Sequence, residues 1–226
     1  MNIAIIPLLT ALLPIAGVNI GYIIAASLDH VPTCFVYFEG CTTISSTGRI
    51  APESLWFRAT IIPCAVLMII CWRLIGGWLQ CIEKESYKGS AIIQTLGILA
   101  GAFLILYTVA LGFTGPEYAI QRRIGVTLFF GLTFLAQLIL SQRLWNFANK
   151  NPKIYPIKLA RLKIILCWFL LIAGLISIPI SNFIGTNKPQ NIVEWNFAIL
   201  MYSYFLLVYW GWRATGFKAR LTVKSS

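Results

Sequence analysis

Long apolar runs alternate with short polar stretches along the whole chain. Each run has about the 20 residues that an α-helix needs to cross the hydrocarbon core of a bilayer. Charged residues gather at the ends of the runs, as expected where a charge inside the membrane is costly. The pattern predicts six spans at about residues 3–27, 55–75, 91–113, 124–144, 164–184 and 195–212. We therefore expect an all-α integral membrane protein, with residues 1–226 forming a single six-span domain.

Composition strengthens this interpretation. The 226 residues are 58% hydrophobic and 11% charged, and the mean hydropathy is +0.79, whereas a soluble domain is about 25% charged. Small residues at Ala25 and Ser27 make the first run similar to a signal peptide. However, no Lys or Arg precedes it, and it is longer than the ~7–15 apolar residues of a signal core, so we expect a span.

The basic residues predict the orientation. With six spans both termini lie on one side, which receives thirteen Lys and Arg against five on the other, and the bias predicts cytosolic termini. The thirteen are Arg73, Lys84, Lys88, Arg143, Lys150, Lys153, Lys158, Arg161, Lys163, Arg213, Lys218, Arg220 and Lys224. The net charge of +11 therefore does not indicate a nucleic-acid partner. The basic side is either a topology signal alone or a surface for anionic lipids.

The polar passage Ile44–Arg58 separates the first two spans. Gly48 allows positive φ and hence a sharp turn. Pro52 suits the first position of a helix, and Glu53 would follow in the first turn, where a negative charge complements the helix dipole. We expect a structured loop that starts a helix; the alternative is a simple turn at the membrane boundary.

Polar residues on the predicted outer side are the candidates for chemistry. His30 is the only histidine and is either a general acid or base or a capping residue at a helix end. Ser45 or Ser46 with His30 and an acid would make a nucleophilic triad, although neither serine lies in a Gly-x-Ser-x-Gly elbow. One histidine and scattered acids fall short of ordinary ligand sets, so we expect no metal and no cofactor.

Two further features of the outer side leave alternatives open. Glu194 precedes the last span and either anchors it among headgroups or points inward, where it needs a partner such as Arg58 or the Ser45–Gly48 backbone. Cys34 and Cys41 share one polar loop and can form a disulfide if that loop faces an oxidising compartment.

Several of these residues together resemble the Frag/DRAM/Sfk family of six-span membrane proteins. The resemblance rests on Ile44-Ser45-Ser46-Thr47-Gly48, Pro52-Glu53 and Phe57 in the loop, and on Glu194-Trp195 at the last span. His30-Val31 is similar to the DRAM branch. Trp56-Phe57-Arg58, with the Trp- and Arg-containing end of the last span, is more similar to the branch of post-GPI-attachment-to-proteins factor 2 and the N-terminal part of Cwh. Gln121-Arg122-Arg123 departs from the family, whose members often have a His there, so a mechanism needing that His is in doubt.

The resemblance implies a role in remodelling the lipid of GPI anchors in the Golgi or endoplasmic reticulum membrane. Its partners would be membrane lipids, GPI-anchored proteins and other membrane proteins. The resemblance leaves open whether the chain is a catalyst or an accessory factor. The alternative is a DRAM-like, non-enzymatic regulator of autophagy or of a phosphoinositide kinase complex, in lysosomes or the plasma membrane. Under the lead hypothesis, His30, Ser45, Ser46, Gly48, Pro52, Glu53, Arg58 and Glu194 form the lumenal loop and its lipid-headgroup contacts.

Overall fold

The computed structural model describes residues 3–83 and 88–218. Their secondary structure consists of helices joined by loops, with no strand. The long helices are α1 (Ile5–Ser27), α3 (Glu53–Glu83), α4 (Lys88–Ala110), α5 (Pro116–Lys150), α6 (Ile157–Ile184) and α7 (Lys188–Ala214). A short helix α2 (Val36–Glu39) and a 3-10 turn η1 (Ser46–Gly48) lie between α1 and α3. The six long helices are each apolar enough to cross a membrane, which confirms the predicted fold class.

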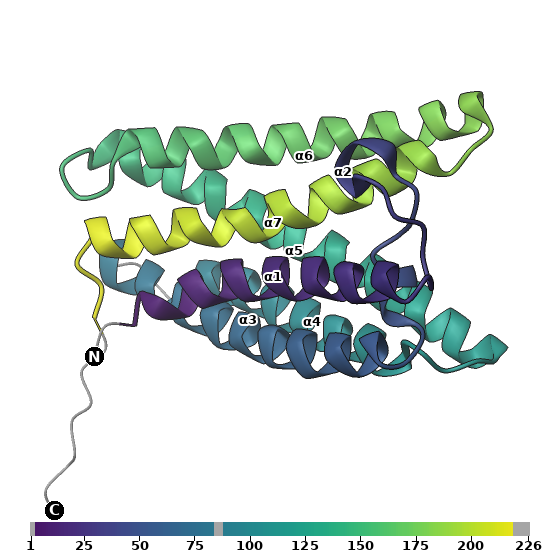
Figure 1. Cartoon of the computed structure of the whole chain (residues 1–226). Helices are drawn as coiled ribbons and strands as arrows, with labels where there is room; N and C mark the ends of the chain where they lie inside the picture. The colour runs from purple at the N-terminus through teal and green to yellow at the C-terminus, as the bar shows by residue number, and fades with distance from the viewer. Residues whose placement is uncertain (1–2, 84–87, 219–226) are drawn as a thin grey trace, which may run out of the picture.

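The long helices form a closed ring. Each packs against the next along the chain, and α7 packs against α1. The first and last described residues lie at one end of the bundle (Figure 1), which we call the terminal end. The opposite end carries residues 28–52 and is called the loop end. The cytosolic location of the terminal end stays a prediction from the charge bias.

Several helices extend beyond the predicted spans. α3 continues to Glu83, and α5 runs from Pro116 to Lys150. Hydropathy marks only the part of a helix that lies in hydrocarbon, and backbone hydrogen bonding continues into the polar layer on either side. The predicted spans at 55–75 and 124–144 therefore lie within longer helices.

The sequence places Lys163 before the predicted span at 164–184, among the cations counted for the side of the termini, and this placement is wrong. Helix α6 begins six residues earlier and carries Lys163 into the bundle with 0% of its surface exposed. Its ammonium group lies 4.0 Å from the centre of the Tyr204 ring and has no hydrogen-bond partner within the described residues. Lys158 and Arg161 lie close by in the sequence, and such a cluster of cations is typical of a loop. Lys84, Arg220 and Lys224 lie outside the described residues.

Candidate functional site at the loop end

The loop begins with a well-defined helix end. Asp29 has a positive φ of 57°, and the backbone N–H groups of Asp29 and His30 donate to Ala26 and Ala25. These two bonds form a Schellman motif, which satisfies carbonyls that a helix end would otherwise leave free. The reversal directs His30 away from α1 and toward the start of α3.

A disulfide joins Cys34 to Cys41 around α2, with the two Cα atoms 6.4 Å apart. The hydroxyl of Tyr22 on α1 donates to the Cys34 carbonyl and accepts from its N–H, each at 2.8 Å. Tyr37 on α2 donates to Asn19 at 2.8 Å; burial raises the pKa of Tyr37, and the bond to Asn19 opposes that rise in part. The segment is therefore fixed to α1 by side chains as well as closed on itself.

The first turns of α7 hold the rest of the loop. Side-chain N–H groups of Asn191, Trp195 and Asn196 donate to the carbonyls of Gly40, Thr42 and Tyr37, at 2.8 to 2.9 Å. Trp195 is fully buried and meets the rings of Tyr22 and Tyr37 edge-on. Loop carbonyls that would otherwise be unpaired are thus satisfied by a helix about 150 residues further along the chain.

Glu194 points inward, toward the loop. Its Oε1 accepts a hydrogen bond of 3.2 Å from the backbone N–H of Ile44, and the backbone of Ser45 also hydrogen-bonds to the carboxyl group. Two partners were expected for an inward Glu194, the loop backbone and Arg58. The structure shows the backbone of Ser45, together with that of Ile44, as the partner, whereas Arg58 binds elsewhere. The carboxylate fixes the start of the motif that carries Ser45, Ser46 and Gly48.

His30 and Glu53 form the second polar connection. His30 Nδ1 lies 2.6 Å from Glu53 Oε1, with the histidine side chain 28% exposed and the glutamate side chain fully buried. Glu53 stands in the first turn of α3, as expected. The other carboxylate oxygen, Oε2, has no partner in the described part of the chain. The pair connects the end of α1 to the start of α3.

The serines are used by the loop itself. Ser45 Oγ is 2.8 Å from the hydroxyl of Tyr107 on α4, and Ser46 Oγ is 2.7 Å from Thr43 Oγ1. Neither serine hydrogen-bonds to His30 among the residues described. The spatial arrangement needed for a Ser–His–acid triad is therefore not assembled here.

Gly48 and Pro52 shape the loop in ways that differ from expectation. Gly48 lies in η1 without a positive φ. Its absent side chain instead makes room, because a Cβ would lie 2.6 Å from Leu111 and 2.9 Å from the Phe57 ring. Pro52 immediately precedes α3 rather than opening it, and its carbonyl accepts from the N–H of Trp56. Close packing is thus the reason for glycine at this turn.

Arg58 lies against the end of α4. It donates to the Leu111 carbonyl, and its guanidinium carbon is 4.8 Å from the centre of the Phe113 ring. Arg122 donates to the carbonyls of Ala110 and Phe113, at 3.3 and 2.8 Å. Arginines at a helix C-terminus satisfy unpaired carbonyls and complement the dipole. The buried Nε of Arg58 has no hydrogen-bond partner among the described residues.

A cavity of about 40 Å³ lies beneath the loop. Glu194 and Tyr107 form its polar part, and apolar side chains such as Phe57, Phe129 and Ala198 form the rest. One water occupies about 30 Å³ in the liquid. The cavity therefore has room for water and is too small for a lipid headgroup.

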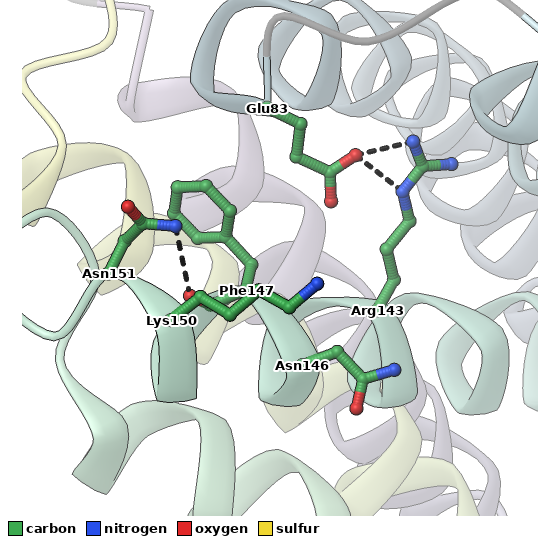
Figure 2. Close-up of a pocket in the computed structure, with 6 residues that line it drawn as sticks. All are labelled: Glu83, Arg143, Asn146, Phe147, Lys150 and Asn151. Atoms are coloured by element: carbon green, nitrogen blue, oxygen red, sulfur yellow. Dashed lines mark hydrogen bonds and ion pairs between the residues drawn. The ribbon is translucent and has the colours of Figure 1, made fainter.

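A second polar pocket, of about 290 Å³, lies at the terminal end. Figure 2 shows Arg143 reaching Glu83 at the end of α3, with Arg143 Nε 2.6 Å from the carboxylate. Asn146, Lys150 and Asn151 line the side formed by the end of α5. Within residues 3–83 and 88–218, no group of three His, Cys, Asp or Glu side chains is placed to hold a metal ion.

Sequence reasoning missed part of the site. Tyr22, Tyr107, Asn191 and Asn196 each bind the loop, yet their spacing along the chain gave no sign of it. For Tyr22, Tyr107 and Asn196 a signal was available in their placement within otherwise apolar runs, where a polar group needs a partner; Asn191 precedes the last apolar run and gave none.

These features define a class: a six-helix membrane protein whose first interhelical loop is closed by a disulfide and held by the last helix. The family model described as Frag1/DRAM/Sfk1/Cwh43P N-terminal domain matches residues 2–215. The chain belongs to this family. No curated protein and no solved structure matches it significantly.

Proposed function

We propose that this protein takes part in remodelling the lipid of GPI anchors, at the lumenal leaflet of the Golgi or endoplasmic reticulum membrane. The observation that carries the proposal is the loop at Ile44–Arg58, organised by Glu194 and adjoined by a disulfide. Disulfides persist in the secretory pathway and are rare in the cytosol, which supports a lumenal loop. Membership of a family that includes the Cwh N-terminal domain supports the same process.

The arginines suggest how a lipid headgroup would be recognised. Arg58 and Arg122 both donate to backbone carbonyls at the end of α4. Arg49 and Arg123 are exposed. Guanidinium groups bind phosphate through charge-assisted, bidentate hydrogen bonds. A GPI anchor carries phosphate at its inositol lipid, so the proposed ligand is a phosphorylated lipid presented by a membrane-anchored protein. In this proposal the loop end binds and orients the lipid.

The test is rescue of cells that lack their own GPI lipid-remodelling factor. The chain is expressed there, and the surface retention and lipid composition of a GPI-anchored reporter are followed. We expect wild type to restore both, Glu194→Ala to restore neither, and Glu194→Gln to restore them in part, because Gln keeps an acceptor for the Ile44 N–H. Absence of rescue by a wild-type chain that reaches the Golgi would refute the proposal.

A second candidate function is favoured by the pocket at the terminal end. If that end is cytosolic, the exposed Lys150, beside the ion pair of Arg143 and Glu83, offers a cation to a cytosolic partner or an anionic lipid. A regulator acting through partner proteins, in lysosomes or at the plasma membrane, would use such a surface. Localisation of the tagged chain separates the two candidates, since the lysosome or cell surface favours the regulator.

A further inference from the structure

Helix α6 is the most open of the membrane-spanning helices. Only 22% of its apolar window is buried, against 39–44% for the other spans, and some of its large side chains are more than half exposed, with Trp168 and Phe169 at 57% and Leu175 at 64%. Figure 1 shows α6 at one side of the bundle, next to α7. In a bilayer this surface is covered by lipid chains, so any hollow in it is open to them rather than to water.

A hollow of about 410 Å³ lies between α6 and α7. Its walls are apolar, with Phe169 and Ala173 on one side and Ile192 and Phe197 on the other, and Asn196 is the one polar lining residue in the described part of the chain. Binding sites for small ligands occupy roughly 300–1,000 Å³. The hollow therefore has the size and the surface chemistry of a site for a hydrocarbon chain.

A second hollow of about 200 Å³ adjoins it on the side of α5, and the two share Leu170 and Phe197 as lining residues. Glycine keeps this second space open. No atom of the described residues lies within 4 Å of the position that a Gly131 side chain would take, and a Cβ on Gly174 would lie 3.8 Å from Phe197. The space at the α5–α6–α7 junction is thus larger than one hollow alone.

The larger hollow begins directly under the loop. Asn196 lines it and donates its side-chain N–H to the Tyr37 carbonyl. Ile192, another lining residue, lies beside Gly40, where a Cβ would be 2.8 Å from it. Glu194 lies on the same helical turns. A chain in the hollow would therefore have its polar end at the loop.

We propose that the hollow between α6 and α7 holds an acyl chain of a glycerolipid whose headgroup lies against the loop. The inference deepens the proposed function, and it rests on that function for the identity of the lipid. A partner's transmembrane helix is the competing occupant. Such a helix is about 10 Å wide and 30 Å long, which is on the order of 2,000 Å³, so the hollow suits one chain better than a helix.

The test uses the full-length chain purified in detergent and phosphatidylinositol carrying a diazirine at the end of one acyl chain. After irradiation, labelled peptides are mapped and quantified by mass spectrometry. Ala173→Phe fills the larger hollow. Its matched control is Ala16→Phe, which places the same side chain on an exposed position of α1. Gly131→Leu fills the smaller hollow, with Gly77→Leu as its control, because both glycines have open space around them.

We expect wild type to be labelled on the facing sides of α6 and α7. Ala173→Phe should weaken that labelling about tenfold, Gly131→Leu should also reduce it, and the two controls should leave it unchanged. Equal labelling of every membrane-facing helix, insensitive to Ala173→Phe, would overturn the proposal. Crosslinking of a co-purified protein helix in place of lipid at this site would overturn it as well.

The same variants in the rescue assay separate this inference from the proposed function. Loss of labelling in Ala173→Phe, with a wild type that cannot rescue remodelling, supports the acyl-chain site and removes the GPI role. Full rescue by Ala173→Phe with unchanged labelling removes the acyl-chain site and leaves the GPI role in place.

Discussion

The pair of His30 and Glu53 allows a quantitative test of how the loop is held. The two atoms are 2.6 Å apart, the glutamate is fully buried and the histidine is 28% exposed. Removing one partner of a fully buried pair costs about 3–5 kcal/mol, because a charge stays behind without compensation. Water reaches the histidine side, so we expect His30→Ala to cost less, about 2 kcal/mol of unfolding free energy.

The order of the losses in unfolding free energy, His30→Ala against Glu53→Ala, tests the reasoning. Glu53→Ala removes the buried carboxylate together with its desolvation cost, so we expect a smaller loss of about 1 kcal/mol. The double variant should lose only about 1 kcal/mol, because the carboxylate left uncompensated in His30→Ala is then absent, and the coupling between the two residues is about 2 kcal/mol. His30→Gln retains an N–H donor and should recover part of the loss.

The assay is equilibrium unfolding of the purified chain in mixed micelles with increasing denaturing detergent, followed by tryptophan fluorescence. All four variants are measured under the same conditions, and the double-mutant cycle gives the coupling. Additivity of the two single changes within about 0.5 kcal/mol would refute the reasoning. A larger loss for Glu53→Ala than for His30→Ala would show that the buried carboxylate is not the costly group.

Three further predictions address other parts of the molecule. Lys163→Met should raise the unfolding free energy by about 1–3 kcal/mol, since Met replaces a buried ammonium group that has no described hydrogen-bond partner; a loss would contradict this. Gly48→Ala should cost about 1–3 kcal/mol by displacing Leu111 or Phe57, and an unchanged unfolding curve would argue against tight packing there. Cys34 and Cys41 should react with a maleimide only after reduction, whereas the exposed Cys81 should react without it; labelling of all three in unreduced protein would exclude the disulfide.

The sequence was sufficient for the membrane architecture and insufficient for the contacts between distant segments. Apolar runs of this length identify helices that cross a bilayer, because a helix satisfies its backbone hydrogen bonds within itself and lipid offers no other partner. The bond from Ile44 to Glu194 joins residues 150 positions apart, and periodicity contains no information about such pairs. Cys34 and Cys41 could be recognised as able to pair, but their separation alone does not place two Cα atoms 6.4 Å apart.

Lys163 shows a different reason for failure. Lys158 and Arg161 precede it, and a cluster of cations next to an apolar run is typical of a cytosolic loop. In the structure α6 already begins at Ile157, and helix geometry then decides which cations face outward. Lys158 and Arg161 are exposed, whereas Lys163 is turned inward onto Tyr204. Position in the sequence indicates the end of a span, but rotation about the helix axis determines burial.

The hydrogen bonds within the loop limit the set of residues that are free to contact a ligand. Ser45 and Ser46 are bound to Tyr107 and Thr43, so using either as a nucleophile would require breaking a hydrogen bond that organises the loop. Glu53 Oε2 and Arg58 Nε, in contrast, are buried polar atoms without a hydrogen-bond partner in the described residues. A buried donor gains most from a charged acceptor, because its desolvation has already occurred. Under the proposed function Arg58 is therefore the expected contact of a phosphorylated headgroup, and variants of Arg58 test lipid recognition more directly than variants of the serines.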